Sequence, residues 1–360
     1  MKNLSRRSFL SSTTLAATGL ALAGTASAQD SGKLNIKLGL DNFSVRNLKW
    51  NAAQLIDYAA SLKTDSLFIT DLGPFKNFED GYLQDLRKMA ADKGLQIHLG
   101  SWSICPTSKA FKKDWGTAEE HLSLGIRMAK ALGSPVFRVI LGTGADRSTE
   151  GGIEARIADT VKVLKSKRSE ALDAGVKVAV ENHAGDMQAW ELVTLIEAAG
   201  KDYVGANIDS GNATWTMEDP QQNLEILGPY VATTSLRDSM IWESNNGATV
   251  QWTAMGEGCV DLKKYFARFA ELCPGIPVHI ETISGFPHEL PYFKKDFWKV
   301  WPKAHASDFA KFLALAKKGK ALPGHKSPDN AAENDYQKEQ IERSIRYCKT
   351  ELGLGQKPVA

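Results

Sequence analysis

The chain has 360 residues, of which 43% are hydrophobic, and a formal net charge of +2 at pH 7. This length and composition suffice for a large buried core, built either as one (β/α)8 barrel or as two domains. The near-neutral charge argues against a nucleic acid partner, because binding to phosphate backbones requires a strongly basic face.

The first 28 residues have the pattern of a twin-arginine export signal. Arg6 and Arg7 stand in the run Ser-Arg-Arg-Ser-Phe-Leu, a weakly apolar segment follows, and Ala26-Ser27-Ala28 has the small residues of a cleavage site. The apolar segment, residues 11–23, is shorter than the roughly 20 apolar residues that a membrane span needs. We therefore expect residues 1–28 to be a signal peptide and the mature protein to be periplasmic or secreted, with no membrane anchor after cleavage. Because this segment holds three basic residues and no acid, cleavage would change the formal charge from +2 to −1.

Four cysteines are scattered along the chain, at Cys105, Cys259, Cys273 and Cys348. None lies in a CxxC motif, which argues against a zinc ribbon and against a thioredoxin-like site. In an oxidising compartment, four cysteines allow one or two disulfides, but the sequence does not pair them.

Short β-branched runs alternate with amphipathic segments throughout residues 33–318. The expected strands are 36–40, 66–70, 95–99, 135–140, 176–180, 204–208, 230–234 and 276–279, and the longer expected helices are 52–62, 82–92, 117–131, 153–174, 187–199, 262–272 and 305–316. Strands separated by helices imply right-handed crossovers and a parallel sheet, so we predict an α/β fold, a (β/α)8 TIM barrel with 305–316 as its last helix. An open doubly wound sheet is the alternative, but no Gly-x-Gly-x-x-Gly motif lies on the first strand-to-helix turn.

Two segments fall outside this repeat. Residues 284–302 are rich in aromatic side chains, which favours either a lid that stacks on a sugar or a satellite core or subunit contact. Residues 319–334 are rich in Gly, Pro, Asn and Lys and are interpreted as a linker. The linker leads to residues 335–360, which we expect to form a C-terminal helix and tail outside the barrel.

Polar residues recur where the later strands end. The strand 176–180 is followed by Glu181-Asn182-His183, and the next two strands are followed by Asp209-Ser210-Gly211-Asn212 and by Ser235-Leu236-Arg237-Asp238; Glu281 closes the eighth. In a parallel barrel these positions meet at the C-terminal rim, where active sites lie. Taken singly, each has a structural interpretation: a carboxylate can cap a helix, the Asp209 segment can form a turn, and Arg237 can pair with Asp238.

The order and spacing of these residues resembles the sugar phosphate isomerase and epimerase superfamily, the xylose isomerase-like barrels related to endonuclease IV. The resemblance covers about residues 33–309. It implies that Glu, Asp, His and Glu side chains from strands five to eight hold one divalent ion, and that the two Glu residues move protons at substrate carbons. On this chain it assigns Glu181, Asp209 and Glu281 as metal ligands, with Glu181 and Glu281 as the catalytic residues.

The fourth ligand departs from this pattern. Where the superfamily usually has His-x-Lys-Asp, this chain has Ser235-Leu236-Arg237-Asp238. His183 is the expected substitute ligand, because it lies two residues after Glu181 and faces the same side if the strand continues. We therefore predict one divalent ion, Mn, Mg or Zn, although a neutral serine hydroxyl is a poor ligand beside three carboxylates.

Further polar and aromatic residues are candidates for substrate binding. They are His98, Trp102, Asn212, Ser235 and Arg237. For His98 a buried structural role is the competing interpretation, and Arg138 in the fourth strand is interpreted as structural.

The leading functional hypothesis is an isomerase or epimerase of a sugar or cyclitol that abstracts a proton next to a carbonyl group with help from the metal. The alternatives are a lyase or hydratase acting on a 3-keto-glycoside or other oxidised sugar, and a non-catalytic sugar-binding barrel. Multi-zinc endonuclease chemistry is disfavoured because the seven histidines are scattered. The expected partner is a small carbohydrate, and a homo-oligomer is compatible with the sequence.

Overall fold

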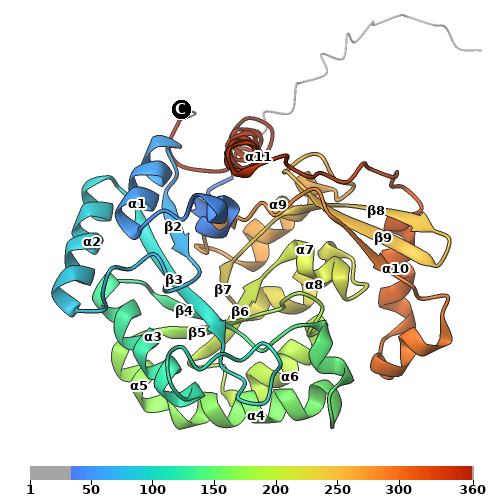
Figure 1. Cartoon of the computed structure of the whole chain (residues 1–360), viewed down its shortest axis with the longest axis horizontal. Helices are drawn as coiled ribbons and strands as arrows, with labels where there is room; N and C mark the ends of the chain where they lie inside the picture. Colours follow the sequence, from blue (N-terminus) through green and yellow to red (C-terminus); the bar gives the residue numbers. More distant parts are fainter. Residues whose placement is uncertain (1–33, 359–360) are drawn as a thin grey trace, which may run out of the picture. The chain divides into compact units, whose positions relative to one another are not determined.

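The computed structural model describes residues 34–358, and the predicted export signal lies outside them. Eight parallel strands form the central sheet, in the order β10-β1-β2-β3-β4-β5-β6-β7 (Figure 1). They are β1 (Leu38–Asp41), β2 (Ser66–Ile69), β3 (Gln96–Ser103), β4 (Val136–Ile140), β5 (Lys177–Glu181), β6 (Val204–Ile208), β7 (Val231–Thr234) and β10 (Val278–Ile280). Between β7 and β10, the sheet closes through a parallel bridge from Leu236 to Ile280. The predicted TIM barrel is confirmed.

Helices lie between consecutive strands on the outside of the barrel (Figure 1). They are α1 (Ala52–Ser61), α2 (Asp80–Asp92), α3 (Ala118–Leu132), α4 (Gly152–Ser166), α5 (Arg168–Ala174), α6 (Ala189–Ala199), α7 (Ser210–Trp215), α8 (Pro220–Leu227) and α9 (Leu262–Leu272), with 3-10 helices η1 (Asn42–Leu48), η2 (Gly144–Ser148) and η3 (Gly228–Tyr230). A further 3-10 helix, η4 (Lys295–Val300), follows the last barrel strand. Among residues 34–358, no helix combines the length and the apolar character that a membrane crossing requires.

Helix α3 illustrates how the sequence sets these boundaries. Thr117 begins the helix with a capping box, in which its side chain accepts from the Glu120 backbone N–H while Glu120 accepts from that of Thr117. Gly133 ends the helix in the left-handed region, at φ 70°, which glycine adopts without a steric penalty.

The eighth helix of the barrel is not the one that the sequence predicts. The expected last helix forms as α10 (Ala306–Ala316), but it packs on β8 (Asp238–Ser244), away from the barrel strands. Helix α11 (Asn330–Thr350) packs instead against η1, β1 and β10, and its Ile341 and Ile345 join the main core. It begins inside the predicted linker because the Asp329 side chain accepts from the Ala332 backbone N–H at 2.9 Å and caps it.

A small antiparallel sheet is inserted near the rim, with the order β11-β9-β8. Its further strands are β9 (Gly247–Thr253) and β11 (Pro287–Leu290). The aromatic segment 284–302 contributes Tyr292 and Trp301 to a second buried cluster that includes Val250 and Phe312. The satellite-core interpretation of this segment is confirmed, and its first aromatic residue, Phe286, has a separate place described below.

The interior of the barrel is polar where two histidines meet. His98 Nδ1 lies 3.0 Å from Thr233 Oγ1, His279 Nε2 lies 3.0 Å from Ser66 Oγ, and the two imidazole centroids are 4.7 Å apart. Burial lowers the pKa of His98 to about 3, so the ring is neutral. Gly39 makes room for the pair, because a Cβ at this position would lie 2.4 Å from His279 Cδ2.

All four cysteines are free thiols in this structure. Cys105, Cys273 and Cys348 are buried, and Cys259 is partly exposed. The described residues therefore contain no disulfide.

Candidate active site

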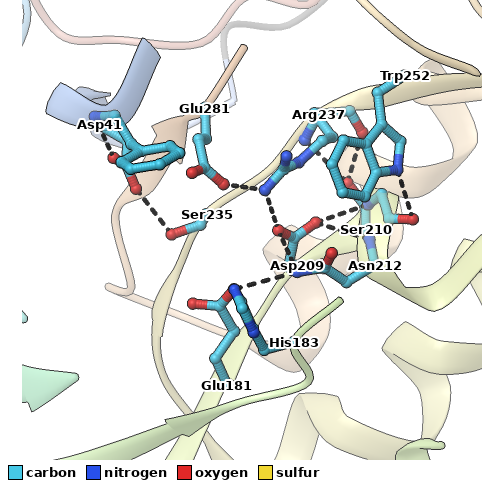
Figure 2. A network of polar contacts seen from close by, with 12 residues as sticks. Asp41, Glu181, His183, Asp209, Ser210, Asn212, Ser235, Arg237, Trp252 and Glu281 are labelled. Atoms are coloured by element: carbon cyan, nitrogen blue, oxygen red, sulfur yellow. Dashed lines mark hydrogen bonds and ion pairs between the residues drawn. The ribbon is translucent and has the colours of Figure 1, made fainter. Parts of the chain in front are cut away.

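The predicted carboxylates come together at the C-terminal rim of the barrel (Figure 2). Glu181 is the last residue of β5, Asp209 directly follows β6, and Glu281 directly follows β10. Asp41, the last residue of β1, joins this group, and its carboxylate accepts a hydrogen bond from the hydroxyl of Ser235. Polar rim residues therefore follow the first strand as well as the later strands for which they were predicted.

A cavity of about 230 Å³ opens beside these residues; we call it the inner cavity. Its lining combines aromatic and charged side chains: Phe43, Thr70, Asp71, Trp102, Arg138, Glu181, His183, Ala184, Asn212, Trp215, Arg237, Trp252, Glu281, Ile283 and Phe286. Six of the predicted site residues are in this set, and His98, Asp209 and Ser235 are not. A separate cavity of about 340 Å³ beside η1 and α1 contains none of the predicted site residues.

Arg237 is the centre of the polar network in Figure 2. Its Nη2 donates to both Asp209 Oδ2 and Glu281 Oε2, and its Cζ lies 4.2 Å from the centroid of the Trp252 ring. Gly211 is required beside it, because a Cβ there would lie 2.3 Å from Arg237 Cγ. The guanidinium is thus clamped between two carboxylates and an aromatic face.

The alternative pairing of Arg237 with Asp238 is wrong. The Asp238 carboxylate accepts instead from the backbone N–H groups of Ser239, Gly256 and Gly258, at 2.7, 3.1 and 2.9 Å. Asp238 therefore holds the loop after β9, while Arg237 turns toward the inner cavity.

Asp209 is fully occupied by hydrogen bonds. Its Oδ1 accepts from the backbone N–H groups of Gly211 and Asn212, at 2.8 and 2.9 Å, and its Oδ2 accepts from Asn212 Nδ2 at 2.7 Å as well as from Arg237. Burial raises the pKa of Asp209 to about 7, although the charge of Arg237 opposes this shift. Asp209 therefore caps α7 and anchors Arg237 from behind the cavity wall.

Glu181 is held as an anion by Arg138. Arg138 Nε donates to Glu181 Oε2 at 2.5 Å, and the amide groups of Asn207 and Asn212 donate at 2.8 and 3.1 Å. Burial acts to raise the pKa of Glu181, but the charge of Arg138 and further favourable contacts outweigh it and lower this pKa. Arg138, which was interpreted as structural, also lines the inner cavity.

Ser235 is buried behind the network. Its hydroxyl donates to Asp41 Oδ2 at 2.9 Å and accepts from Asn207 Nδ2 at 3.3 Å. Burial raises the pKa of Asp41 to about 6. The sequence analysis missed Asp41, although an acid that ends the first apolar strand run is the same signal that identified Glu181.

His183 and Trp102 form one wall of the inner cavity, with ring centroids 5.4 Å apart in an edge-on arrangement. His183 Nδ1 lies 2.7 Å from the Gly142 carbonyl oxygen, which can only accept, so Nδ1 carries the proton. Burial lowers the pKa of His183, and the neutral ring leaves Nε2 as an acceptor.

The side chains do not have the arrangement of the predicted ion site. Arg237 Nη2 stands between Asp209 and Glu281, Arg138 pairs with Glu181, and Ser235 is directed to Asp41. Across residues 34–358, no three His, Cys, Asp or Glu side chains are grouped as ion ligands. Two guanidinium groups neutralise these carboxylates, so the donor set does not fit a divalent ion.

The network leaves several hydrogen-bonding atoms unpaired. Arg237 Nε, Arg237 Nη1 and Asn212 Oδ1 are buried and have no hydrogen-bond partner in the described part of the chain, and both residues line the inner cavity. Buried polar atoms are rarely left unpaired without a reason. A ligand that offers both donors and acceptors, such as a polyhydroxy compound, would satisfy them.

The model of the xylose isomerase-like TIM barrel family matches residues 56–299. The chain belongs to this family. A curated relative, the 3-oxo-isoapionate decarboxylase of Pectobacterium atrosepticum, is 19% identical over 211 residues, which are 58% of this chain and 69% of the relative.

Two solved structures show the same fold. The structure of D-psicose 3-epimerase in the presence of D-fructose has a TM-score of 0.57 and 15% identity, and covers 88% of this chain and all of its own. The IOLI protein with a bound zinc atom has a TM-score of 0.54 and 15% identity, and covers 80% of this chain and all of its own. Zinc is therefore bound by a protein of this fold, whereas the three carboxylates predicted as ligands here are paired with arginines, and His183 is bonded to the Gly142 carbonyl oxygen.

Proposed function

We propose that the chain is a sugar-modifying enzyme that abstracts a proton from a carbon next to a carbonyl group, and that it isomerises or epimerises a small sugar or cyclitol. One observation carries the proposal: the Glu281 carboxylate and the unpaired N–H groups of Arg237 stand side by side in the wall of the inner cavity. The family membership and the name of the D-psicose 3-epimerase structure support it.

Glu281 is the proposed base. Its Oε2 accepts from Arg237, and that is the one hydrogen bond to its side chain within residues 34–358, so Oε1 is available to take a proton. As the C–H bond breaks, its electron pair forms a C=C bond and the carbonyl oxygen becomes an enolate oxygen. The N–H groups of Arg237 stabilise that negative charge, as preorganised donors do in other enolising enzymes.

The completed reaction depends on where the proton returns. Transfer by Glu281 to the neighbouring carbon on the same face, while the proton of the adjacent hydroxyl group passes to the enolate oxygen, interconverts an aldose and a ketose and needs one carboxyl group. Epimerisation needs a second acid on the opposite face, and Glu181 is poorly suited because Arg138 stabilises its anion. The geometry therefore favours isomerisation, with Glu181 accepting hydrogen bonds from sugar hydroxyl groups.

The remaining wall of the inner cavity suits a sugar ring. Trp102, Trp252 and Phe286 supply apolar faces, while Asn212 and His183 supply acceptors. The volume of about 230 Å³ lies below that of pockets that enclose drug-sized ligands, which matches one small ring.

The divalent ion stays a prediction from the sequence. The proposal assigns the role of electrophile to Arg237 because its guanidinium lies between two of the expected ligands.

A second candidate is a lyase that acts on a 3-keto-glycoside. The relative named as a decarboxylase favours it, since that name denotes cleavage of a bond. The first step is the same, but the electron pair of the enolate then expels the glycosidic oxygen from the adjacent carbon. The leaving oxygen takes the proton that Glu281 has accepted, so one carboxyl group again suffices.

Proton exchange with solvent tests both candidates. We expect incubation in D₂O with a panel of ketoses, inososes and 3-keto-glycosides to place deuterium at one carbon of the true substrate, observed by NMR and mass spectrometry. Glu281→Gln should slow this exchange by a factor on the order of 10² or more, which is the usual contribution of a positioned general base. Recovery of an aldose and ketose pair supports the isomerase, and release of an aglycone supports the lyase.

Glu271→Gln is the matched control, because Glu271 is an exposed carboxylate that pairs with Arg268 on the surface. Thermal unfolding of both variants checks that they are folded. Unchanged exchange in the Glu281→Gln variant would refute the assignment of the base, and binding of a panel compound without any exchange would favour a non-catalytic binding barrel.

A further inference from the structure

A second cavity, of about 450 Å³, adjoins the inner cavity; we call it the outer cavity. Ala184 and Trp215 line both. Since two residues form walls of both spaces, the two cavities are direct neighbours.

The boundary between the cavities has Trp215 on one side and small residues on the other. Ala184 lines both cavities, Gly185 and Gly144 line the outer one beside it, and Gly144 N–H donates to the Ala184 carbonyl oxygen at 2.9 Å. A Cβ at position 144 would already lie 3.3 Å from the Gly185 carbonyl oxygen. Larger side chains in this region would narrow the opening between the two spaces.

Ala184 also has an unusual backbone conformation, with φ at 41°, in the left-handed region that residues other than glycine rarely adopt. Such strain costs on the order of 1 to 3 kcal/mol and is concentrated at ligand sites, where neighbouring structure maintains it. Here the hydrogen bond from Gly144 and the bond from His183 N–H to Asp186 Oδ1, at 2.8 Å, maintain it.

Aromatic rings form much of the wall of the outer cavity. Trp215 is stacked between Trp252 and His288, with centroid distances of 4.3 and 4.0 Å, and this stack extends from Arg237 to the outer cavity. Trp301 stands on another side and is fixed by Arg147, whose Cζ lies 3.6 Å from the ring centroid. Walls of this kind suit a flat apolar face, as both sugar rings and aryl rings present.

We propose that the outer cavity binds the second ring of a glycoside whose keto-sugar ring reacts in the inner cavity. The inference rests on the lyase candidate of the proposed function, whose substrate is a 3-keto-glycoside, and it restricts that substrate to two-ring glycosides. The second ring, joined through the glycosidic oxygen, is either another sugar or an aryl group.

Binding measurements separate this inference from the proposed function. Calorimetry on the full mature enzyme compares three 3-keto-glycosides of the same sugar: the methyl glycoside, the phenyl glycoside and a disaccharide. We expect at least one two-ring compound to bind about tenfold more tightly than the methyl glycoside, a difference of about 1.4 kcal/mol. A gain for the phenyl compound alone identifies an aryl group, and a gain for the disaccharide alone identifies a second sugar.

Ala145→Trp tests the location, because Ala145 is exposed, lines the outer cavity and does not line the inner one. The new indole should fill the outer cavity and abolish the preference for two rings. Phe293→Ala is the control. Phe293 lies in the aromatic segment 284–302, is 70% exposed and lines neither cavity, so this variant should keep the preference for two-ring compounds.

Equal affinity of the wild-type enzyme for all three compounds would overturn the inference, as would a preference that survives Ala145→Trp. In both cases deuterium exchange into the methyl glycoside would leave the proposed function intact. A preference without exchange into any compound would instead refute the proposed function and support the outer cavity as a binding site.

Discussion

At the scale of single residues, Arg237 distinguishes this site from the ion site that the sequence predicts. It occupies the space between Asp209 and Glu281, and the serine at position 235 is hydrogen-bonded to Asp41 where the family pattern expects a histidine. The planar guanidinium can contact both carboxylates through one nitrogen, stack on Trp252 and still present Nε and Nη1. A lysine ammonium carries the same charge but cannot do all three.

Arg237→Lys should therefore slow deuterium exchange by a factor on the order of 10², the usual effect of removing one donor to a developing oxyanion. The rate constant is measured by NMR in D₂O at saturating substrate. Arg268→Lys, at an exposed surface ion pair, serves as the control. Full activity of the Arg237→Lys variant would show that charge alone is sufficient and that the planar contacts are dispensable.

At the scale of elements, Glu218 connects three helices beside the site. Its carboxylate accepts from the Ala189 backbone N–H at 2.9 Å at the start of α6, from Thr216 Oγ1 at 3.1 Å after α7, and from Asn223 Nδ2 at 3.1 Å in α8. Burial raises the pKa of Glu218 to about 7, although these hydrogen bonds oppose the shift. The folded protein thus retains this proton at pH values where the unfolded chain has released it.

The contribution of Glu218 to the free energy of unfolding should consequently fall as pH rises from about 4.5 through about 7, because this carboxyl group binds more protons in the folded state than in the unfolded state in this window. Glu218→Gln should remove this part of the pH dependence, which is on the order of 1 to 3 kcal/mol across the window. Urea denaturation at a series of pH values provides the measurement. Glu271→Gln is expected to retain the wild-type slope, and an identical slope in the Glu218→Gln variant would contradict the raised pKa.

At the scale of the whole molecule, local patterns predicted the barrel well. Alternating strand and helix periodicity and acids at strand ends are local signals, and both appear in the structure at their expected places. Contacts between distant segments were not predictable in this way. Helix α11 replaces α10 in the barrel wall because Asp329 caps it inside a polar segment and because it fits against η1, and neither feature appears in the periodicity.

The site shows the same limit. Glu181 and Glu281 were identified from strand ends, but the partner of Arg237 depends on Gly211, which lets the side chain pass close to α7, and on Trp252 from the inserted sheet. For Arg138, a single charged residue in an apolar strand does not show which carboxylate lies opposite. Register and barrel closure decide that question, and both are properties of the assembled sheet.

The most direct test of the account is the rate of deuterium exchange in enzyme treated with a chelator, measured together with the metal content by elemental analysis. The account assigns the electrophile to Arg237, so it predicts an unchanged exchange rate in protein that holds well below one equivalent of Mn, Mg or Zn. Loss of exchange after chelation, restored by adding one equivalent of a divalent ion, would contradict it.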